Sequence, residues 1–296
     1  MELRQGSAGV SGIVVTRFAP SPTGYLHLGH AFAALNAHQH AKSSQGARFL
    51  LRIENIDSSR CRSEFEHAIY EDLGWLGLAW EQPVLRQSDR FSAYRSALER
   101  LDSQGMLYPC FCTRSDILAE IRRAAEAPHG PDGPLYPGTC RNLSRDERQA
   151  RINSGAVYAL RLDTAKAAAR TGALSFEEIG NGPGGERGTI AADPLLFGDV
   201  VLARKDTPTS YHLAVVVDDA SKGVTLVTRG NDLFTATYVQ RLLQALLGFA
   251  TPRYAHHRLI LDERGQKFSK RNSAVTLRHL REQGVTPEQI RLRIAV

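Results

Sequence analysis

Residues 13–30, IVVTRFAPSPTGYLHLGH, decide the fold of this 296-residue chain. The first six residues are β-branched, aromatic or otherwise strand-compatible, and they predict a short buried strand at 13–18. Two prolines and a glycine at 20–24 then forbid regular structure. An alanine- and leucine-rich run at 30–40 follows and predicts a helix. The chain therefore enters a strand, breaks at an irregular junction and continues as a helix.

The same alternation continues beyond this first unit. Residues 48–53, RFLLRI, predict a second strand, and a second helix is expected from Glu64 onward. Strand, helix, strand, helix is the pattern of an α/β fold whose parallel sheet is built with right-handed crossovers. The alternation returns at 213–219, an apolar run that we expect to be a central parallel strand, and continues with a helix at 237–247 and an apolar segment at 258–261.

Between about 105 and 190 the alternation breaks, because turn-forming stretches at 127–134 and 181–185 interrupt it. We expect an inserted subdomain at 105–190 within a Rossmann-type domain formed by 13–104 and 191–271. A loose N-terminal arm at 1–12 and a short helical segment at 272–296 complete the expected organisation. In the last segment, helices are expected at 276–283 and from Thr286.

Composition limits the functional classes. Lys and Arg number 37 against 31 Asp and Glu, the net charge is +6, and 42% of residues are hydrophobic, as in globular proteins. The positive charge permits a nucleic-acid partner without requiring one. No stretch approaches the roughly 18 apolar residues of a membrane helix, and the first residues lack the apolar region of a secretory signal. Four cysteines do not form a disulfide framework, so we expect a cytoplasmic protein without a membrane partner.

Polar groups gather where the first strand meets its helix. His27 and His30 place two imidazole donors at a helix N-terminus, where free N–H groups and the dipole attract anions. Gly29 leaves room for a flat ligand such as a nucleobase. Two histidines near a helix start are more often ordinary polar residues, so their spacing alone does not establish a site.

The whole sequence of residues 17–30 is a much more specific signal than the two histidines. It resembles the HIGH signature of class I aminoacyl-tRNA synthetases, with Leu28 in place of isoleucine, and RFAPSPTG resembles the form found in the glutamyl/glutaminyl branch. Residues 267–271, KFSKR, resemble the KMSKS loop of the same enzymes, with Phe268 for methionine and Arg271 for serine. An isolated pair of lysines would more often belong to a solvated basic loop.

The resemblance implies that a carboxylate attacks the α-phosphate of ATP and that pyrophosphate leaves. The protein then mainly positions the reactants and stabilises charge on phosphoryl oxygens. ATP, taken with Mg²⁺, is expected at His27, Gly29, His30 and Lys270. The expected catalytic donors are His27, His30, Lys267 and Lys270.

A glutamate site follows from the same resemblance. It assigns the side-chain carboxylate of the substrate to Arg17 and the backbone carboxylate and ammonium regions to Ser21 and Glu54. The blocks at 211–219 and 228–232 add Tyr211 and Arg229. A lone arginine or tyrosine is more often a salt-bridge or packing residue. The assignment of a glutamate site therefore depends on the expected position of these residues at strand ends, where open α/β sheets bind ligands. The expected glutamate-binding residues are Arg17, Phe18, Ala19, Pro20, Ser21, Glu54, Tyr211 and Arg229.

Three cysteines suggest a metal site within the insertion. Cys110, Cys112 and Cys140 can supply three thiolates to a tetrahedral zinc ion, which we expect once per chain. The fourth ligand is open: His129 is the conventional choice, whereas the resemblance favours Tyr136, because a Cys-x-Cys…Tyr-x-x-x-Cys site occurs in a truncated relative of glutamyl synthetases. Three reduced cysteines without metal are the alternative. Cys61 lies outside this pattern.

After Arg271 only 25 residues remain, too few for an anticodon-binding domain. The chain therefore resembles the glutamyl-Q tRNA(Asp) synthetase family. This implies tRNA-independent activation of L-glutamate by ATP, followed by transfer to queuosine at the wobble position of tRNA(Asp), by an expected monomer. Two alternatives stay open: a minimal glutamyl-tRNA synthetase that charges a tRNA 3′ end, and a non-catalytic paralogue that acts as a binding module. Candidate contacts to RNA phosphates are Arg122, Arg123, Arg141 and Arg145.

Overall fold

The computed structural model describes residues 12–42, 45–123, 129–131, 133–261 and 275–295. One half of its central sheet consists of β1 (Val15–Phe18), β2 (Arg48–Ile53) and β3 (Glu81–Arg86). These strands pair in parallel in the order β1-β2-β3. The strands at 13–18 and 48–53 that the sequence predicts are confirmed.

The other half has the strand order β11-β12-β8-β9. β11 (Leu226–Gly230), β12 (Arg253–His257) and β8 (Leu174–Glu178) run parallel, and β9 (Gly188–Ala192) pairs antiparallel at the edge. β8 lies within the range 105–190 that we assigned to the insertion and β9 begins within it, yet both belong to this sheet. The limits of the inserted subdomain therefore stay a prediction.

The two halves meet between β1 and β11. The Thr225 N–H donates to the Val15 carbonyl at 3.0 Å, and the Val15 N–H donates to the Thr225 hydroxyl at 2.9 Å. The strands thus follow the order 3-2-1-11-12-8, and the direction of the chain order reverses between β1 and β11. In open α/β sheets, ligands bind outside the carboxyl ends of the strands at such a switch point.

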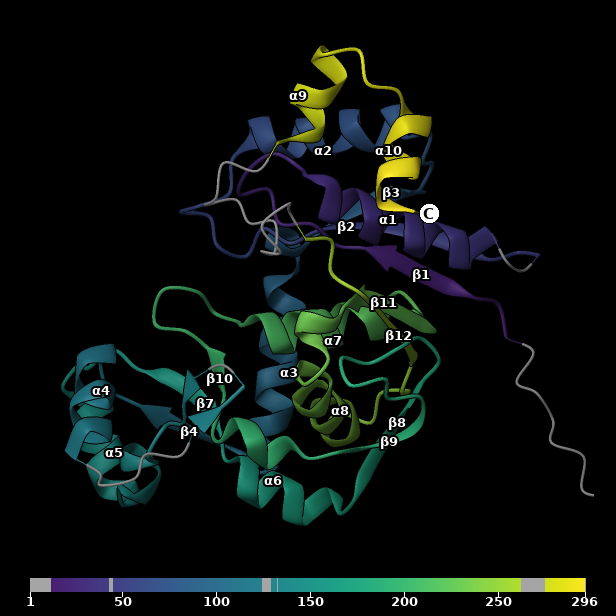
Figure 1. The fold of residues 1–296 in the computed structure, drawn as a ribbon. Helices are drawn as coiled ribbons and strands as arrows, with labels where there is room; N and C mark the ends of the chain where they lie inside the picture. The colour runs from purple at the N-terminus through teal and green to yellow at the C-terminus, as the bar shows by residue number, and fades with distance from the viewer. Residues whose placement is uncertain (1–11, 43–44, 124–128, 132, 262–274, 296) are drawn as a thin grey trace, which may run out of the picture.

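Helices cover both parts of the sheet. In the upper part of Figure 1, α1 (Leu28–Lys42) and α2 (Ser63–Trp75) pack with the C-terminal helices α9 (Leu277–Glu282) and α10 (Pro287–Ile294), around a core that includes Phe32, Leu73 and Ile290. The helices expected at 30–40, from Glu64, at 276–283 and from Thr286 are therefore confirmed.

A second core lies among three other helices. α3 (Phe91–Ser103), α7 (Tyr211–Ser221) and α8 (Ala236–Leu246) bury Leu101, Val215 and Leu242 against one another. The helix expected at 237–247 corresponds to α8.

The strand expected at 213–219 is wrong, because these residues lie in α7. Ser210 caps this helix by accepting a hydrogen bond from the Leu213 N–H at 3.5 Å. Residues 213–219 are buried throughout, so the helix lacks the polar face that would reveal its period. The strand near the apolar segment 258–261 is β12, which ends just before it.

A smaller lobe projects from one side of the molecule (Figure 1). β4 (Leu107–Cys110), β7 (Ala159–Leu162) and β10 (Val201–Ala203) form its antiparallel sheet in the order β10-β7-β4. The lobe also contains α4 (Arg114–Arg123), the short paired strands β5 (His129–Gly130) and β6 (Gly133–Pro134), and α5 (Arg145–Asn153), whereas α6 (Thr164–Thr171) packs against α8 of the second core.

Of the N-terminal arm expected at 1–12, residues 1–11 lie outside the described residues. None of the helices described here combines the length and apolar character that a bilayer crossing requires.

Candidate active site

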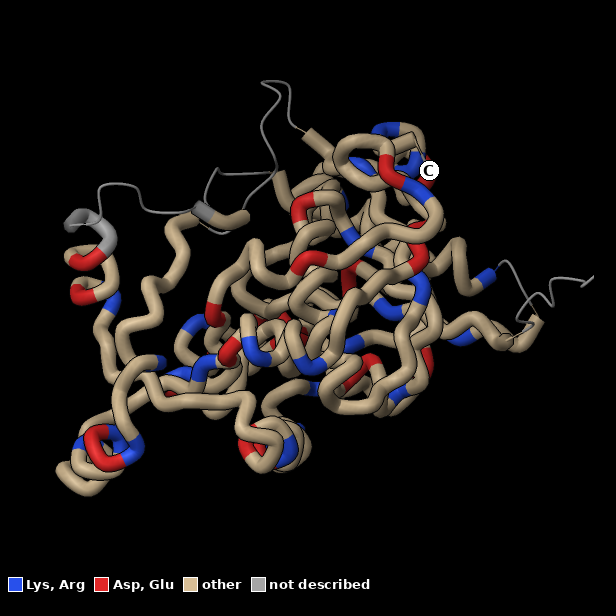
Figure 2. Tube along the Cα trace, turned by 90° about the horizontal axis from the view of Figure 1, so that it is seen from below, with Lys and Arg blue, Asp and Glu red and all other residues tan. Residues whose placement is uncertain are grey.

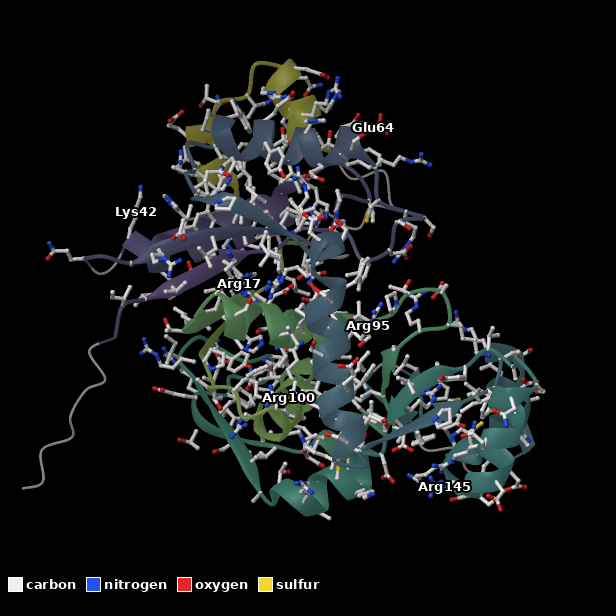
Figure 3. All side chains as sticks on the ribbon, turned by 180° about the vertical axis from the view of Figure 1, so that it is seen from behind. Arg17, Lys42, Glu64, Arg95, Arg100 and Arg145 are labelled. Atoms are coloured by element: carbon white, nitrogen blue, oxygen red, sulfur yellow. The ribbon has the colours of Figure 1, made fainter. Side chains whose placement is uncertain are left out.

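A cleft of about 390 Å³ opens at the switch point, between the end of β1, the start of α1 and the end of β11. This volume is within the usual range for small-molecule sites, roughly 300–1,000 Å³. Figure 3 shows Arg17 between the two halves of the molecule. The predicted site residues that line the cleft are Arg17, Phe18, Ala19, His27, Gly29, His30, Glu54, Tyr211 and Arg229.

The other four predicted residues form two groups. Pro20 and Ser21 follow Ala19 along the chain but are not part of the described cleft lining. Lys267 and Lys270 lie outside the described residues, so their roles stay predictions. The flanks of their segment are anchored at the site, because Ile260 lines the cleft and the Leu277 N–H donates to the Leu26 carbonyl at 2.8 Å.

The two histidines are held ring against ring, with their centroids 3.8 Å apart. Nδ1 of His27 accepts a hydrogen bond from the Gly29 N–H at 3.1 Å, and Nδ1 of His30 accepts one from the His27 N–H at 3.2 Å. A neutral imidazole that accepts at Nδ1 carries its proton on Nε2. Both rings therefore act as Nε2–H donors.

Gly29 is required beside these rings. A Cβ at this position would lie 3.1 Å from Cε1 and 3.2 Å from Nδ1 of His27. Any side chain would therefore press on the imidazole that the Gly29 N–H holds in place.

A buried ion-pair network lies around Arg17. Its Nε donates to Oδ1 of Asp219 at 3.0 Å, and its Nη1 donates to the Thr228 carbonyl at 3.2 Å. Asp219 also accepts from Nη1 of Arg52 at 2.5 Å, and Nη2 of Arg52 donates to Glu54 at 2.9 Å. Burial alone would raise the pKa of Asp219, but the two arginines hold that pKa below its ordinary value. Burial raises the pKa of Glu54, although Arg52 opposes the shift.

Arg229 is held differently from Arg17. Its Nε donates to Nε2 of His256 at 3.1 Å, its Nη1 to Oε1 of Gln240 at 2.8 Å and its Nη2 to the Thr237 hydroxyl at 2.6 Å. The residue is only 6% exposed, and none of its partners among the described residues is a carboxylate. A buried cation without a counter-ion is costly, so this position is suited to an anionic ligand group.

The sequence interpretation missed part of the cleft wall. His257 lines it at the end of β12, with Nδ1 hydrogen-bonded to the Arg258 carbonyl and Nε2 buried without a partner among the described residues. The Arg258 guanidinium lies 4.9 Å from the centre of the Phe32 ring. The consecutive histidines 256 and 257 were a visible signal in the sequence. However, no strand was predicted at 253–257, so the sequence did not indicate that these histidines lie at a strand end. The other missed lining residues are Phe32, Ala33, Thr228, Gly230, Asp232, Leu233, Leu259 and Ile260.

The cysteine cluster forms a second candidate site. The sulfur atoms of Cys110, Cys112 and Cys140 all lie within 4.8 Å of one another. The Tyr136 hydroxyl is 3.4 Å from Sγ of Cys110 and 3.6 Å from Sγ of Cys112, and Sγ of Cys112 is 3.4 Å from Sγ of Cys140. Tetrahedral bonds of about 2.3 Å would place sulfur ligands about 3.7 Å apart, so this donor set fits zinc. Tyr136 is the fourth group at the cluster, whereas the side chain of His129 lies outside the described part of the chain.

The arginines proposed for RNA contact are not alike. Nη1 of Arg141 pairs with the buried carboxylate of Asp199 at 3.1 Å, which gives it a structural partner. Arg145 lies on the projecting lobe, well away from Arg17 (Figure 3). The side chains of Arg122 and Arg123 lie outside the described residues. Figure 2 shows basic and acidic positions interspersed along the trace instead of separated onto two faces.

Comparisons with known proteins identify the family of this chain. The family model described as tRNA synthetases class I (E and Q), catalytic domain, matches residues 13–295. A glutamyl-Q tRNA(Asp) synthetase of Rhodobacter capsulatus is 50% identical over 94% of this chain and 98% of its own length. One of Symbiobacterium thermophilum is 42% identical over 93% of this chain and 83% of its own length.

A solved structure has the same architecture. It is a glutamate tRNA ligase from Elizabethkingia meningosepticum in complex with its amino acid, with a TM-score of 0.73 and 29% identity over 88% of this chain. The present chain spans about half of that ligase, 52% of its length. The chain belongs to the class I tRNA synthetase (E and Q) catalytic-domain family of ligases, in the branch of its glutamyl-Q tRNA(Asp) synthetase relatives.

Proposed function

We propose that this enzyme activates L-glutamate with ATP to form glutamyl-adenylate and transfers the glutamyl group to queuosine at the wobble position of tRNA(Asp). The observation that carries the proposal is the cleft at the switch point, which combines a paired-histidine helix start with a buried arginine, Arg229, that has no carboxylate partner among the described residues. The first feature suits a nucleotide phosphate and the second suits an acidic amino acid.

Two arginines would recognise the amino acid, and they differ in whether a carboxylate of the protein pairs with them. Arg17 donates through Nε to Asp219, so its charge is largely balanced. Arg229 has only neutral partners among the described residues, so we assign the side-chain carboxylate of glutamate to Arg229 in place of Arg17, to which the sequence resemblance assigned it. Tyr211, at the first turn of α7, lines the cleft beside it. The similar glutamate tRNA ligase structure is in complex with its amino acid, which supports glutamate as the substrate class.

Activation requires charge stabilisation at phosphorus. The α-carboxylate of glutamate attacks the α-phosphate of ATP, the bond from the α-phosphorus to its bridging oxygen breaks, and pyrophosphate leaves. His27 and His30 would donate from Nε2 to the phosphoryl oxygens that gain negative charge. Lys267 and Lys270 are proposed to contact the β- and γ-phosphates, and ATP is taken with Mg²⁺.

Transfer completes the reaction. A hydroxyl of the queuosine cyclopentene ring attacks the glutamyl carbonyl carbon, an ester forms and AMP leaves. The names of the relatives from Rhodobacter capsulatus and Symbiobacterium thermophilum support tRNA(Asp) as the partner.

Zinc is proposed to be structural in this enzyme. The residues Cys110, Cys112, Tyr136 and Cys140 would hold one ion with four protein ligands, which leaves no open position for a substrate. When bound, the ion would crosslink β4 to the segment that follows β6 through these four side chains. The site thereby orders the projecting lobe.

The activation half is tested without RNA. Purified enzyme is incubated with ATP, labelled pyrophosphate and each amino acid in turn, and label exchange into ATP is measured. We expect exchange with glutamate, clearly above that with glutamine or aspartate. Exchange with another amino acid alone would contradict the proposed substrate, and absence of exchange with all of them would favour the binding-module alternative.

A further inference from the structure

Three adjacent parallel strands end in a chain of polar side chains next to the cleft. Arg229 lies near the end of β11, and its Cα partner across the ladder is His256 of β12. Glu178 is the last residue of β8, the next strand in the sheet. The side chains of His256 and Glu178 are fully buried, with 0% exposure each. A charged group is rarely buried so completely unless it has a specific partner.

The hydrogen bonds define the state of the central imidazole. The Nε–H of Arg229 can only donate, so Nε2 of His256, 3.1 Å away, must accept. The imidazole proton then lies on Nδ1, which donates to Oε2 of Glu178 at 2.5 Å. Burial lowers the pKa of His256. Burial alone would raise the pKa of Glu178, but hydrogen bonds from His256 and from the Gly180 N–H lower it below its ordinary value. A neutral imidazole therefore separates a carboxylate from a guanidinium.

The backbone holds Glu178 in the same place. Its Oε1 accepts from the His256 N–H at 2.9 Å and from the Gly180 N–H at 2.8 Å. A Cβ on Gly180 would lie 2.4 Å from the His256 carbonyl oxygen and 2.7 Å from the His256 nitrogen. The loop after β8 can close on β12 only because residue 180 is glycine. This close approach fixes the carboxylate relative to the imidazole.

The arrangement differs in its electrostatics from that of Arg17. Asp219 contacts Arg17 directly, which offsets the charge of that arginine. Glu178 reaches Arg229 only through His256, so the imidazole orients the guanidinium while the carboxylate stays one ring away. Coulomb attraction falls with distance, and the cleft side of Arg229 keeps most of its positive charge.

Building on the proposed function, we propose that His256 and Glu178 are positioning residues that orient Arg229 without neutralising it, and that they thereby determine the preference for glutamate over glutamine. The carboxylate of glutamate then meets an oriented guanidinium with an available charge. Glutamine, which offers only an amide dipole, gains much less from that charge.

Two variants of nearly equal size separate charge from shape. In His256→Gln and His256→Glu, a side-chain oxygen can still accept from the Nε of Arg229, but only the glutamate neutralises it. We expect the KM for glutamate in pyrophosphate exchange to be at least about tenfold higher in H256E than in H256Q, equivalent to about 1.4 kcal/mol. The KM for ATP should differ little between them. Equal glutamate KM values in the two variants would overturn the proposal, and an equal rise in the KM for ATP in H256E would indicate a general disturbance by the nearby Glu178 carboxylate and would also count against it.

Glu178→Gln tests the other end of the chain of hydrogen bonds. Its amide can donate to Nδ1 of His256, which would shift the imidazole proton to Nε2 and place it against the Nε–H of Arg229. We expect a higher KM for glutamate and a reduced preference over glutamine. Glu177→Gln is the matched control, since Glu177 is exposed on the same strand. An unchanged preference in E178Q would contradict the role of Glu178.

Direct binding keeps the two proposals distinguishable. Glutamate binding by calorimetry and thermal unfolding are measured for the wild type and all variants. If the wild type neither binds nor activates glutamate, the proposed function itself fails. If the wild type activates glutamate and H256E matches H256Q, only the positioning role fails.

Discussion

Asp219 of α7 contacts two arginines from adjacent strands at once, and its carboxylate lies 3.0 Å from Nε of Arg17 and 2.5 Å from Nη1 of Arg52. The side chains involved are at most 10% exposed. The buried carboxylate of Asp219 therefore offsets the charges of two guanidinium groups that are shielded from solvent. It also joins the helix of the second core to β1 and β2, directly beside the cleft.

Removing Asp219 should therefore be costly. We expect Asp219→Ala to lower the free energy of unfolding by about 3–5 kcal/mol, because it removes the carboxylate that accepts from Nε of Arg17 and from Nη1 of Arg52, two buried guanidinium groups. Urea unfolding followed by circular dichroism measures this loss. Glu81→Ala is the control, since Glu81 pairs with Arg48 at an exposed site and should cost less than about 1 kcal/mol. Similar losses in both variants would contradict the account.

Gly29 should be essential for activation. In Gly29→Ala the new Cβ would lie 3.1 Å from the His27 ring and displace its Nε2–H donor. We expect glutamate-dependent pyrophosphate exchange to fall by about 100-fold, the typical effect of losing one preorganised donor.

Gly74→Ala is the control for this variant. Gly74 lies in α2, and a Cβ there meets nothing within 4 Å. Exchange should stay at the wild-type rate, and stability should rise by up to about 1 kcal/mol. Equal exchange rates in G29A and G74A would show that the His27 ring does not need the space at residue 29.

The zinc proposal predicts about one zinc per chain by elemental analysis of purified protein. Tyr136→Phe removes the hydroxyl that lies 2.9 Å from the Cys140 N–H and contacts two sulfur atoms. Zinc should then be lost to a chelator at a lower concentration than from the wild type. His129→Ala should retain zinc like the wild type. The reverse result would make His129 the fourth ligand, and a folded wild type without metal would contradict the site.

Asp72 should make stability depend on pH. Its carboxyl is fully buried in α2, has no hydrogen-bond partner among the described residues and lies 3.7 Å from Nη1 of Arg281. Burial raises the pKa of Asp72 from 3.8 to about 6, although Arg281 opposes the shift. The folded state therefore holds a proton that the unfolded chain has released, so stability falls as the pH rises from about 4 to about 6.

Asp72→Asn removes this ionisation. We expect the wild type to lose about 1–3 kcal/mol relative to D72N between pH 4 and pH 7.5, measured by urea unfolding at both values. A difference between the two proteins that does not change with pH would contradict the raised pKa.

The sequence was sufficient for the first half of the sheet. β-branched and aromatic residues at 13–18 and 48–53 alternate with helical runs, and the prolines at 20 and 22 mark the junction between strand and helix. The site at that junction could be predicted because a contiguous string carries it. Nine predicted residues, from Arg17 to Arg229, do line one cleft.

The second half was harder to predict for physical reasons. Residues 213–217 are apolar on all sides of a buried helix, and such a run has no period that separates helix from strand. The Ser210 cap was the available signal. β12, RYAHH, carries two histidines in place of an apolar pattern, and Glu178 reaches His256 only through strand pairing. Contacts between residues 78 positions apart are set by tertiary structure, which local patterns do not encode.

Glutamate transfer to RNA is the decisive assay for the proposed reaction. Labelled glutamate, ATP and the enzyme are incubated with tRNA(Asp) that carries queuosine, with tRNA(Asp) that lacks it, and with tRNA(Glu). We expect label only on the queuosine-containing tRNA(Asp), retained after removal of the 3′ adenosine. Label on queuosine-free tRNA(Glu) that disappears with the 3′ adenosine would contradict it.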